Sequence, residues 1–234
     1  MVPWQILARA RTPDGAALVL GRRGDEFAIH VRTVELMNSR VHFSEDTLGK
    51  RAGEAARALA ADPYVVIGGL GMGFTLRAAL DALPANARVD VVELSPDVVA
   101  WNHGELGTVA GRPLDDPRVR VVQADVGEVI RNAEPHSLHA LALDVDNGPN
   151  ALTIPGNAAL YGDRGLGEAA RAVAPGGFCG VWSVFAAPPF TTRLRRASFT
   201  VEVERVRAYP GGGPQHYLWL AQAPKAARTP AAAR

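Results

Sequence analysis

The sequence predicts an α/β protein built on a doubly wound, mostly parallel sheet, with a small β-region in front of it. From residue 64 onward, short apolar runs alternate with segments of helical periodicity, the pattern of parallel strands joined by crossover helices. Before residue 44, apolar and polar side chains alternate instead around short polar turns. The final apolar segments, near 199–206 and 217–221, flank a turn rich in Pro and Gly.

Composition excludes several classes of protein. A chain of 234 residues with 47% hydrophobic and 21% charged residues can bury an extensive core, which excludes wholesale disorder. The formal net charge of +1 predicts neither a nucleic-acid nor a membrane-surface partner. No apolar run approaches the roughly 18 residues of a membrane span. The lone Cys179 excludes an internal disulfide and a cysteine-cluster metal site, so no metal is predicted, and we expect a cytoplasmic protein.

Residues 1–43 are predicted to form a β-hairpin region. Its apolar positions alternate around the polar turn at 22–25: Leu18, Leu20, Phe27, Ile29 and Val31. Such spacing gives a hairpin with one apolar face. Exposed hairpins of this kind would offer a surface for a homodimer.

A helix is predicted to begin at Ser44 and to run to about residue 61. Ser44 supplies a capping hydroxyl, and Glu45 and Asp46 place two acids in the first turn, where they complement the helix dipole. The Ala-rich stretch that follows gives this helix a weak apolar stripe.

Five apolar runs predict the strands of the main sheet: 64–67, 89–92, 119–122, 138–143 and 178–182. The segments between them that are predicted to be helical lie near 74–83, 97–104, 126–133 and 160–173. The last two alternating segments predict an antiparallel pair at the sheet edge. We expect this α/β domain to span 44–224, followed by a disordered tail at 225–234.

A glycine-rich loop, Gly68-Gly69-Leu70-Gly71-Met72-Gly73, follows the first of these strands. Its glycines permit a tight turn and let a ligand approach the bare backbone. The dinucleotide fingerprint would need glycine where Phe74 stands, so a dinucleotide is disfavoured. A phosphate-binding loop is excluded because no lysine follows the glycines. The alternative to a ligand site is a plain strand-to-helix turn.

Acidic residues end the next three predicted strands. Glu93, which follows Gly73 by 20 residues, can accept both hydroxyl protons of a ribose; the alternative is a solvated carboxylate. Asp125, with the N–H of Val126, could pair with adenine, could cap the following helix, or could do both. Asp144 ends the fourth strand. Three acids around one glycine loop favour a neutral or cationic adenosine ligand over a nucleotide phosphate.

Three stretches resemble the S-adenosylmethionine site of class I methyltransferases: Val66-Ile67-Gly68-Gly69-Leu70-Gly71-Met72-Gly73, Val92-Glu93-Leu94-Ser95 and Gln123-Ala124-Asp125. The fuller resemblance is to the spermidine synthase-like proteins, the polyamine aminopropyltransferase family. It adds Glu35-Leu36-Met37-Asn38-Ser39-Arg40, His42-Phe43-Ser44-Glu45 and Pro175-Gly176-Gly177, and it covers roughly residues 21–220.

This resemblance implies a class I methyltransferase-like (Rossmann-like) fold that binds S-adenosylmethionine or its decarboxylated form. The residues it assigns to that ligand are Gly68, Gly69, Leu70, Gly71, Gly73, Glu93, Leu94, Asp125, Val126 and Asp144. Aminopropyl transfer to an amine would also need a carboxylate near the sulfonium, because the amine must lose a proton.

The acceptor half of the site departs from the family. The family's base lies in an Asp-x-x-Asp-Pro motif after the fourth strand, where this chain has Asp144-Val145-Asp146-Asn147-Gly148-Pro149. Asp144 matches the first acid, but Asn147 cannot act as a base, so Asp146 is the candidate displaced base. The family's tyrosine falls here at 165–167, and Tyr161 is out of register. Trp182 could line the acceptor pocket or belong to the core.

Three functions follow from these observations. The leading one is a spermidine synthase-like transferase that moves an aminopropyl group to a small-molecule amine, with Asp144 and Asp146 as its catalytic acids. The second is methyl transfer to a small molecule, and the third is a catalytically inert relative that binds an adenosyl ligand. The two acids favour the decarboxylated donor, because its methionyl end carries an ammonium where the intact donor also carries a carboxylate.

Overall fold

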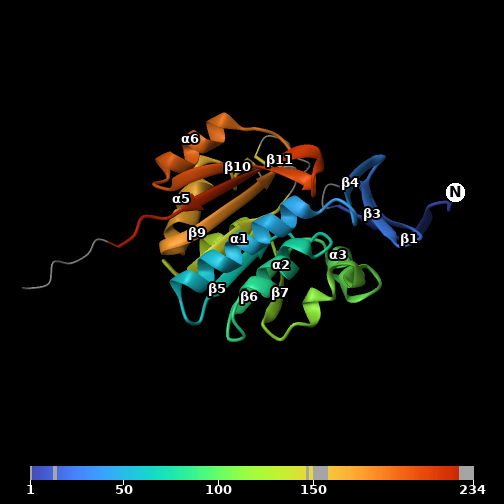
Figure 1. The fold of residues 1–234 in the computed structure, drawn as a ribbon, viewed down its shortest axis with the longest axis horizontal. Coiled ribbons are helices and arrows are strands. Elements are labelled where there is room, and N and C mark those ends of the chain that lie inside the picture. The colour runs from blue at the N-terminus through green and yellow to red at the C-terminus, as the bar shows by residue number, and fades with distance from the viewer. Residues whose placement is uncertain (1, 13–14, 146–147, 150–157, 227–234) are drawn as a thin grey trace, which may run out of the picture.

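The computed structural model describes residues 2–12, 15–145, 148–149 and 158–226. It contains a four-stranded antiparallel sheet and a mixed seven-stranded sheet with helices on both faces (Figure 1). The α/β class with an N-terminal β-extension is therefore confirmed. The N-terminal sheet lies at one end of the molecule, and the last described residues lie at the other (Figure 1).

The N-terminal sheet is a meander of four strands: β1 (Gln5–Arg11), β2 (Ala17–Arg23), β3 (Glu26–Val31) and β4 (Val34–Asn38). Leu18 pairs with Val31 and Leu20 with Ile29, which confirms the predicted hairpin. These four side chains are buried in the same core cluster as the first helices, so the apolar face of the small sheet packs against the main domain.

The seven-stranded sheet has the order β10-β11-β9-β8-β5-β6-β7. Its strands are β5 (Tyr64–Gly68), β6 (Arg88–Glu93), β7 (Val119–Gln123), β8 (Leu138–Leu143), β9 (Val173–Ser183), β10 (Thr200–Tyr209) and β11 (Gly212–Gln222). The first five are parallel, and β11 and β10 form the predicted antiparallel pair at one edge. The strand order reverses between β5 and β8, which is where such sheets bind ligands.

The fifth parallel strand begins earlier than the sequence predicts. β9 starts at Val173 and contains the Pro175-Gly176-Gly177 segment that was expected to precede it. The pairing with β8 shifts register between Leu138 and Ala140, and Gly176 has a φ of 77°. This irregularity admits a turn-like segment into a continuous strand, because glycine tolerates that backbone conformation.

Helices cover both faces of the sheet. One face carries α1 (Phe43–Leu59), α2 (Phe74–Ala82) and α3 (Pro96–His103); the other carries α4 (Val126–Asn132), α5 (Asp163–Ala172) and α6 (Pro188–Arg196). Two short 3-10 helices, Leu106–Ala110 and Pro113–Asp115, follow α3. Val65 and Ile67 of β5 face the α1 side and Val66 faces the other, as strand alternation requires. Within the described ranges, no helix has the length and apolar character needed to cross a bilayer.

The start of α1 differs from the prediction. The helix begins at Phe43, its N-cap residue is His42, and the His42 side chain makes no capping hydrogen bond. Ser44 therefore lies inside the first turn and is completely buried. The predicted capping role of Ser44 is wrong because tertiary partners use its hydroxyl, as described below.

Helices α1 and α2 lie side by side and pack closely (Figure 1). A Cβ atom at Gly49 would come within 2.1 Å of the backbone oxygen of Thr75, so glycine is needed at this contact. The close approach brings the start of α2 next to the first turn of α1. Thr75 and Glu45 thereby meet at one end of the sheet.

Candidate active site

The glycine loop forms the centre of the candidate site. Gly69, Gly71 and Gly73 have φ values of 90°, 51° and 88°, in the left-handed region that favours glycine. The N–H of Asp144 donates to the carbonyl of Gly68 at 2.8 Å, and the N–H of Gly69 donates to the carbonyl of Val92 at 2.9 Å. The loop is thus joined to both neighbouring strand ends at the reversal point of the sheet.

Glu93 is held in place by two backbone amides. Its Oε2 accepts a hydrogen bond from the Leu70 N–H at 3.1 Å, and its Oε1 accepts one from the Ser95 N–H at 2.8 Å. The side chain lines the first pocket. Because each carboxylate oxygen has a second lone pair, the carboxylate can still accept hydroxyl protons from a ligand.

Asp125 caps α4. Its Oδ1 accepts a hydrogen bond from the Glu128 N–H at 3.2 Å, so the capping role that the sequence allowed is confirmed. Asp125 and Val126 also line the first pocket. The helix-capping role therefore leaves the side chain in a position to contact a ligand as well.

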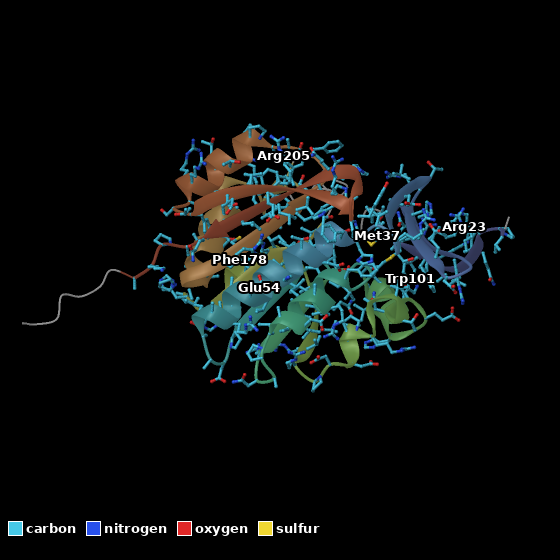
Figure 2. The ribbon with its side chains drawn as sticks, viewed as in Figure 1. Arg23, Met37, Glu54, Trp101, Phe178 and Arg205 are labelled. Carbon is cyan, nitrogen blue, oxygen red and sulfur yellow. The ribbon has the colours of Figure 1, made fainter. Side chains whose placement is uncertain are left out.

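The first pocket encloses about 160 Å³ at the carboxyl end of the parallel strands. Of the residues predicted for the adenosyl ligand, seven line it: Gly69, Gly71, Glu93, Leu94, Asp125, Val126 and Asp144. Its opposite wall comes from the N-terminal sheet and the residue that follows β1: Leu18, Ile29, Val31, Leu36 and Met37, with Thr12. Figure 2 shows Met37 between that sheet and the rest of the molecule. This apolar wall was not predicted, because nothing in the local sequence shows where the small sheet docks.

The other three residues predicted for this ligand lie elsewhere. Gly68 is the last residue of β5, and a Cβ there would meet Val126. Leu70 lines a second pocket. Gly73 is the N-cap of α2 and faces Pro113, so its glycine serves the turn. The structure places these three around the first pocket without exposing them to it.

The second pocket encloses about 100 Å³ and adjoins the first. It is lined by Leu36, Met37, Asn38, Glu45, Leu70, Gly71, Met72, Phe74, Thr75, Asp144 and Trp182. Four residues line both pockets, so the two spaces meet at them: Leu36, Met37, Gly71 and Asp144. Trp182 lines this pocket and, at only 8% exposed, also belongs to the core.

Two carboxyl groups, those of Glu45 and Asp144, face the second pocket together. Burial, followed by the nearby charge of Asp144, raises the pKa of Glu45 to about 7. Burial raises the pKa of Asp144 to about 6, although a 2.6 Å hydrogen bond from the Thr75 hydroxyl opposes that rise. The sequence indicated Glu45 only as a first-turn acid; its approach to Asp144 depends on how α1 packs on α2.

The described lining of the second pocket contains no lysine, arginine or histidine. A pair of carboxylates in such a place is poorly compensated, because each ion loses solvation and repels the other. A bound cation would relieve both effects. The pocket is therefore suited to a positively charged ligand.

Asp146 and Tyr161, the residues that the sequence offers for the acceptor half of the site, are not among the described residues that line either pocket. Asp146, the candidate displaced base, lies outside the described residues, as does Asn147. Tyr161 is buried, and its hydroxyl donates to the carbonyl of Val145 at 3.2 Å. Tyr161 is absent from the described lining of both pockets.

Neither family models nor curated protein sequences yield a match to this chain. Solved structures do. The chain is similar to a spermidine synthase in complex with the transition state analogue AdoDATO, with a TM-score of 0.71, 16% identity, and coverage of 93% of this chain and 72% of that one. Spermidine synthase from Thermotoga maritima gives a TM-score of 0.73 at 16% identity, again over 93% and 72% of the two chains.

A probable spermidine synthase from Corynebacterium glutamicum gives a TM-score of 0.63 at 17% identity, over 94% of this chain and 79% of that chain. The likeness extends over 93–94% of this chain. The chain therefore has the spermidine synthase-like form of the methyltransferase-like α/β fold.

Proposed function

We propose that the protein is a transferase that binds decarboxylated S-adenosylmethionine and moves its aminopropyl group to a small amine. The observation that carries this proposal is the carboxyl pair of Glu45 and Asp144 in the second pocket. Both the sulfonium of the donor and the ammonium form of an amine are cations. The pair would attract them by charge, and the described lining supplies no competing basic side chain.

The first pocket would hold the adenosyl part of the donor. Glu93 would accept the ribose hydroxyl protons, and Asp125 with the Val126 N–H would face adenine. The apolar residues of the N-terminal sheet would cover the opposite side of the ligand. The sulfonium would then lie near Asp144 and Gly71, where the two pockets meet.

The proposed reaction is a displacement at the methylene carbon beside the sulfonium. The lone pair of the acceptor nitrogen forms the new C–N bond while the C–S bond breaks and its electrons stay on sulfur. Sulfur becomes the neutral thioether of 5′-methylthioadenosine, and the acceptor nitrogen gives its surplus proton to a carboxylate. Most of the rate advantage would come from holding nucleophile and carbon in line.

Product analysis by mass spectrometry tests this proposal. Both donors are supplied with a mixture of putrescine, cadaverine, spermidine and diaminopropane. We expect 5′-methylthioadenosine to appear only when protein, decarboxylated donor and amine are all present. S-adenosylhomocysteine would instead show methyl transfer, and measurable donor binding without either product would show an inert binder.

Variants identify the residues that take part. Asp144→Asn should abolish turnover and leave binding of 5′-methylthioadenosine nearly intact, because the adenosyl contacts remain. Glu54→Gln is the matched control, since Glu54 lies on α1 with Glu45 but pairs with Lys50 away from both pockets. Wild-type turnover by Asp144→Asn would remove Asp144 from the mechanism.

A further inference from the structure

A chain of hydrogen-bonding side chains leads from the second pocket into the protein interior. Ser44 Oγ lies 2.5 Å from Glu45 Oε2 and 2.7 Å from His216 Nδ1, and it accepts a hydrogen bond from Trp182 Nε1–H at 2.9 Å. Ser44 is completely buried, and His216 is 6% exposed. The members come from α1, β9 and β11.

The chemistry of Ser44 limits how protons can be arranged along this chain. Trp182 can only donate, so it occupies one lone pair of the Ser44 oxygen. The other lone pair and the hydroxyl proton remain for Glu45 and His216. In one arrangement Ser44 donates to ionised Glu45 and accepts from His216 Nδ1–H. In the other, protonated Glu45 donates to Ser44, which donates to the bare Nδ1 of His216.

We propose that, in the aminopropyl transfer put forward above, Glu45 takes the proton from the acceptor nitrogen and passes it through Ser44 to His216. This inference rests on the proposed function. The N–H bond of the acceptor breaks and an O–H bond forms on Glu45. This step requires the neutral His216 ring to carry its proton on Nε2, so that Nδ1 is bare. The Ser44 hydroxyl turns from Glu45 to Nδ1, the Glu45 proton moves to Ser44 Oγ, and the Ser44 proton moves to His216 Nδ1. The imidazolium that results then loses its Nε2 proton to water.

The surroundings of the two ends suit Glu45 as the first proton acceptor and His216 as the group that releases the proton. Burial, and then the charge of Asp144, raises the pKa of Glu45, while burial lowers the pKa of His216, so a proton is held more firmly by Glu45 and stays on His216 only in passing. The other nearby charge at the carboxyl end is Asp46, which faces His42. A neutral imidazole can accept a proton and pass it on without retaining it.

The strands beside His216 add few charges on its face of the sheet. Its neighbour on β10 is the apolar Val206, and Glu204 on that strand is paired with Arg51 of α1 at 3.1 Å. Arg205 and Arg207 alternate with Val206 and therefore point to the other face. None of these groups competes for Nδ1, which contacts Ser44.

Asp144 has no comparable route among the described residues. Its Oδ2 accepts from Thr75, and the Thr75 hydroxyl otherwise reaches only the backbone carbonyl of Glu45, at 3.3 Å. A backbone carbonyl cannot relay a proton onward. Asp144 is therefore placed to hold the cation by charge, whereas Glu45 is placed to remove a proton.

Single-turnover rates of 5′-methylthioadenosine formation across a pH series test the relay. We expect Ser44→Ala and His216→Asn to slow the chemical step by about 100-fold at pH 7, the lower end of the range of acid–base catalysis, with little change in the KM for the amine. The deficit should shrink at high pH, where the amine arrives unprotonated. Ser44→Thr keeps the hydroxyl and should retain most of the rate.

Ser137→Ala and His136→Asn serve as matched controls, because these residues lie in the turn before β8, away from both pockets. Thermal unfolding of each variant shows whether it is folded. If folded Ser44→Ala and His216→Asn keep the wild-type rate and pH profile, the relay is overturned. If wild-type protein forms no 5′-methylthioadenosine with any amine, the proposed function itself is overturned.

NMR of the free protein tests the hydrogen-bonded chain of Glu45, Ser44 and His216 without requiring any reaction. The ¹⁵N shifts of the His216 ring nitrogens are followed through a pH titration of the free protein. We expect Glu45→Gln and Ser44→Ala each to shift the His216 titration or its tautomer, while His136→Asn leaves them unchanged. An unchanged His216 titration in Ser44→Ala would overturn the relay whatever the activity shows.

Discussion

A Cβ atom at Gly69 would lie 2.1 Å from the backbone oxygen of Asp144. The start of the glycine loop and the end of β8 therefore leave no room between them for a side chain at Gly69. This contact makes the floor of the site at the point where the order of the strands reverses. The position of the Asp144 backbone therefore depends on residue 69 being glycine.

Gly69→Ala should destabilise the protein by about 2 kcal/mol or more, because the positive φ is unfavourable for alanine and the new Cβ would clash with the backbone oxygen of Asp144. It should also weaken binding of 5′-methylthioadenosine. Urea denaturation and calorimetry measure the two effects. Gly167→Ala is the control: Gly167 lies in α5 with open space around it, so alanine there should stabilise slightly. Equal stability of the two variants would contradict this account of the loop.

Glu93→Gln should weaken binding of 5′-methylthioadenosine by roughly 10- to 100-fold, because hydrogen bonds to a charged acceptor contribute about 1.5–3 kcal/mol. The amide can keep only one of the two backbone hydrogen bonds that hold the carboxylate. Calorimetry measures the affinity, with Glu105→Gln as the control, since Glu105 forms an exposed pair with Arg22. If Glu93→Gln weakened the binding of the 2′-deoxy analogue by the same factor as the binding of 5′-methylthioadenosine, that result would argue against a contact between Glu93 and the ribose 2′-hydroxyl.

The Glu45–Asp144 pair should make the free protein less stable as the pH rises. The folded-state pKa values of about 7 and about 6 lie above the ordinary values of 4.5 and 3.8. Between those limits the folded protein binds more protons than the unfolded chain, so the free energy of unfolding falls with increasing pH. Urea denaturation at pH 5 and pH 7.5 should show a smaller fall in Glu45→Gln than in wild type or Glu54→Gln. Identical falls would refute the pairing.

Thr75→Val should raise the pKa of Asp144 further, because the Thr75 hydroxyl stabilises the ionised carboxyl. Binding of a diamine in the presence of 5′-methylthioadenosine should then be weaker near pH 6 and approach the wild-type affinity at higher pH. Thr47→Val is the control, since the Thr47 hydroxyl bonds to the backbone of its own helix. A loss of affinity that does not depend on pH would mean that Thr75 acts by packing alone.

The parts of the site that lie in local motifs could be predicted from the sequence. Glycine spacing and acids at strand ends located Gly69, Glu93, Asp125 and Asp144, because parallel strands bring their carboxyl ends to one edge. The structure places all four on the first pocket. The fold class followed in the same way from the alternation of apolar runs and helical segments.

The parts that depend on tertiary packing could not be predicted. Ser44 is 138 residues from Trp182 and 172 from His216, and no local pattern joins them. The same serine resembled a helix cap, because capping is the commonest local use of a hydroxyl followed by acids. The wall of Leu36 and Met37 likewise depends on where the small sheet docks.

The most direct test of the central claim uses decarboxylated S-adenosylmethionine carrying ¹³C in its aminopropyl carbons, offered to the wild-type protein with the diamine mixture. The account predicts that mass spectrometry finds the label in a lengthened amine, together with one unlabelled 5′-methylthioadenosine for each label transferred, and that Asp144→Asn yields neither. Label that stays in the donor with every amine, while the donor binds, would contradict the account.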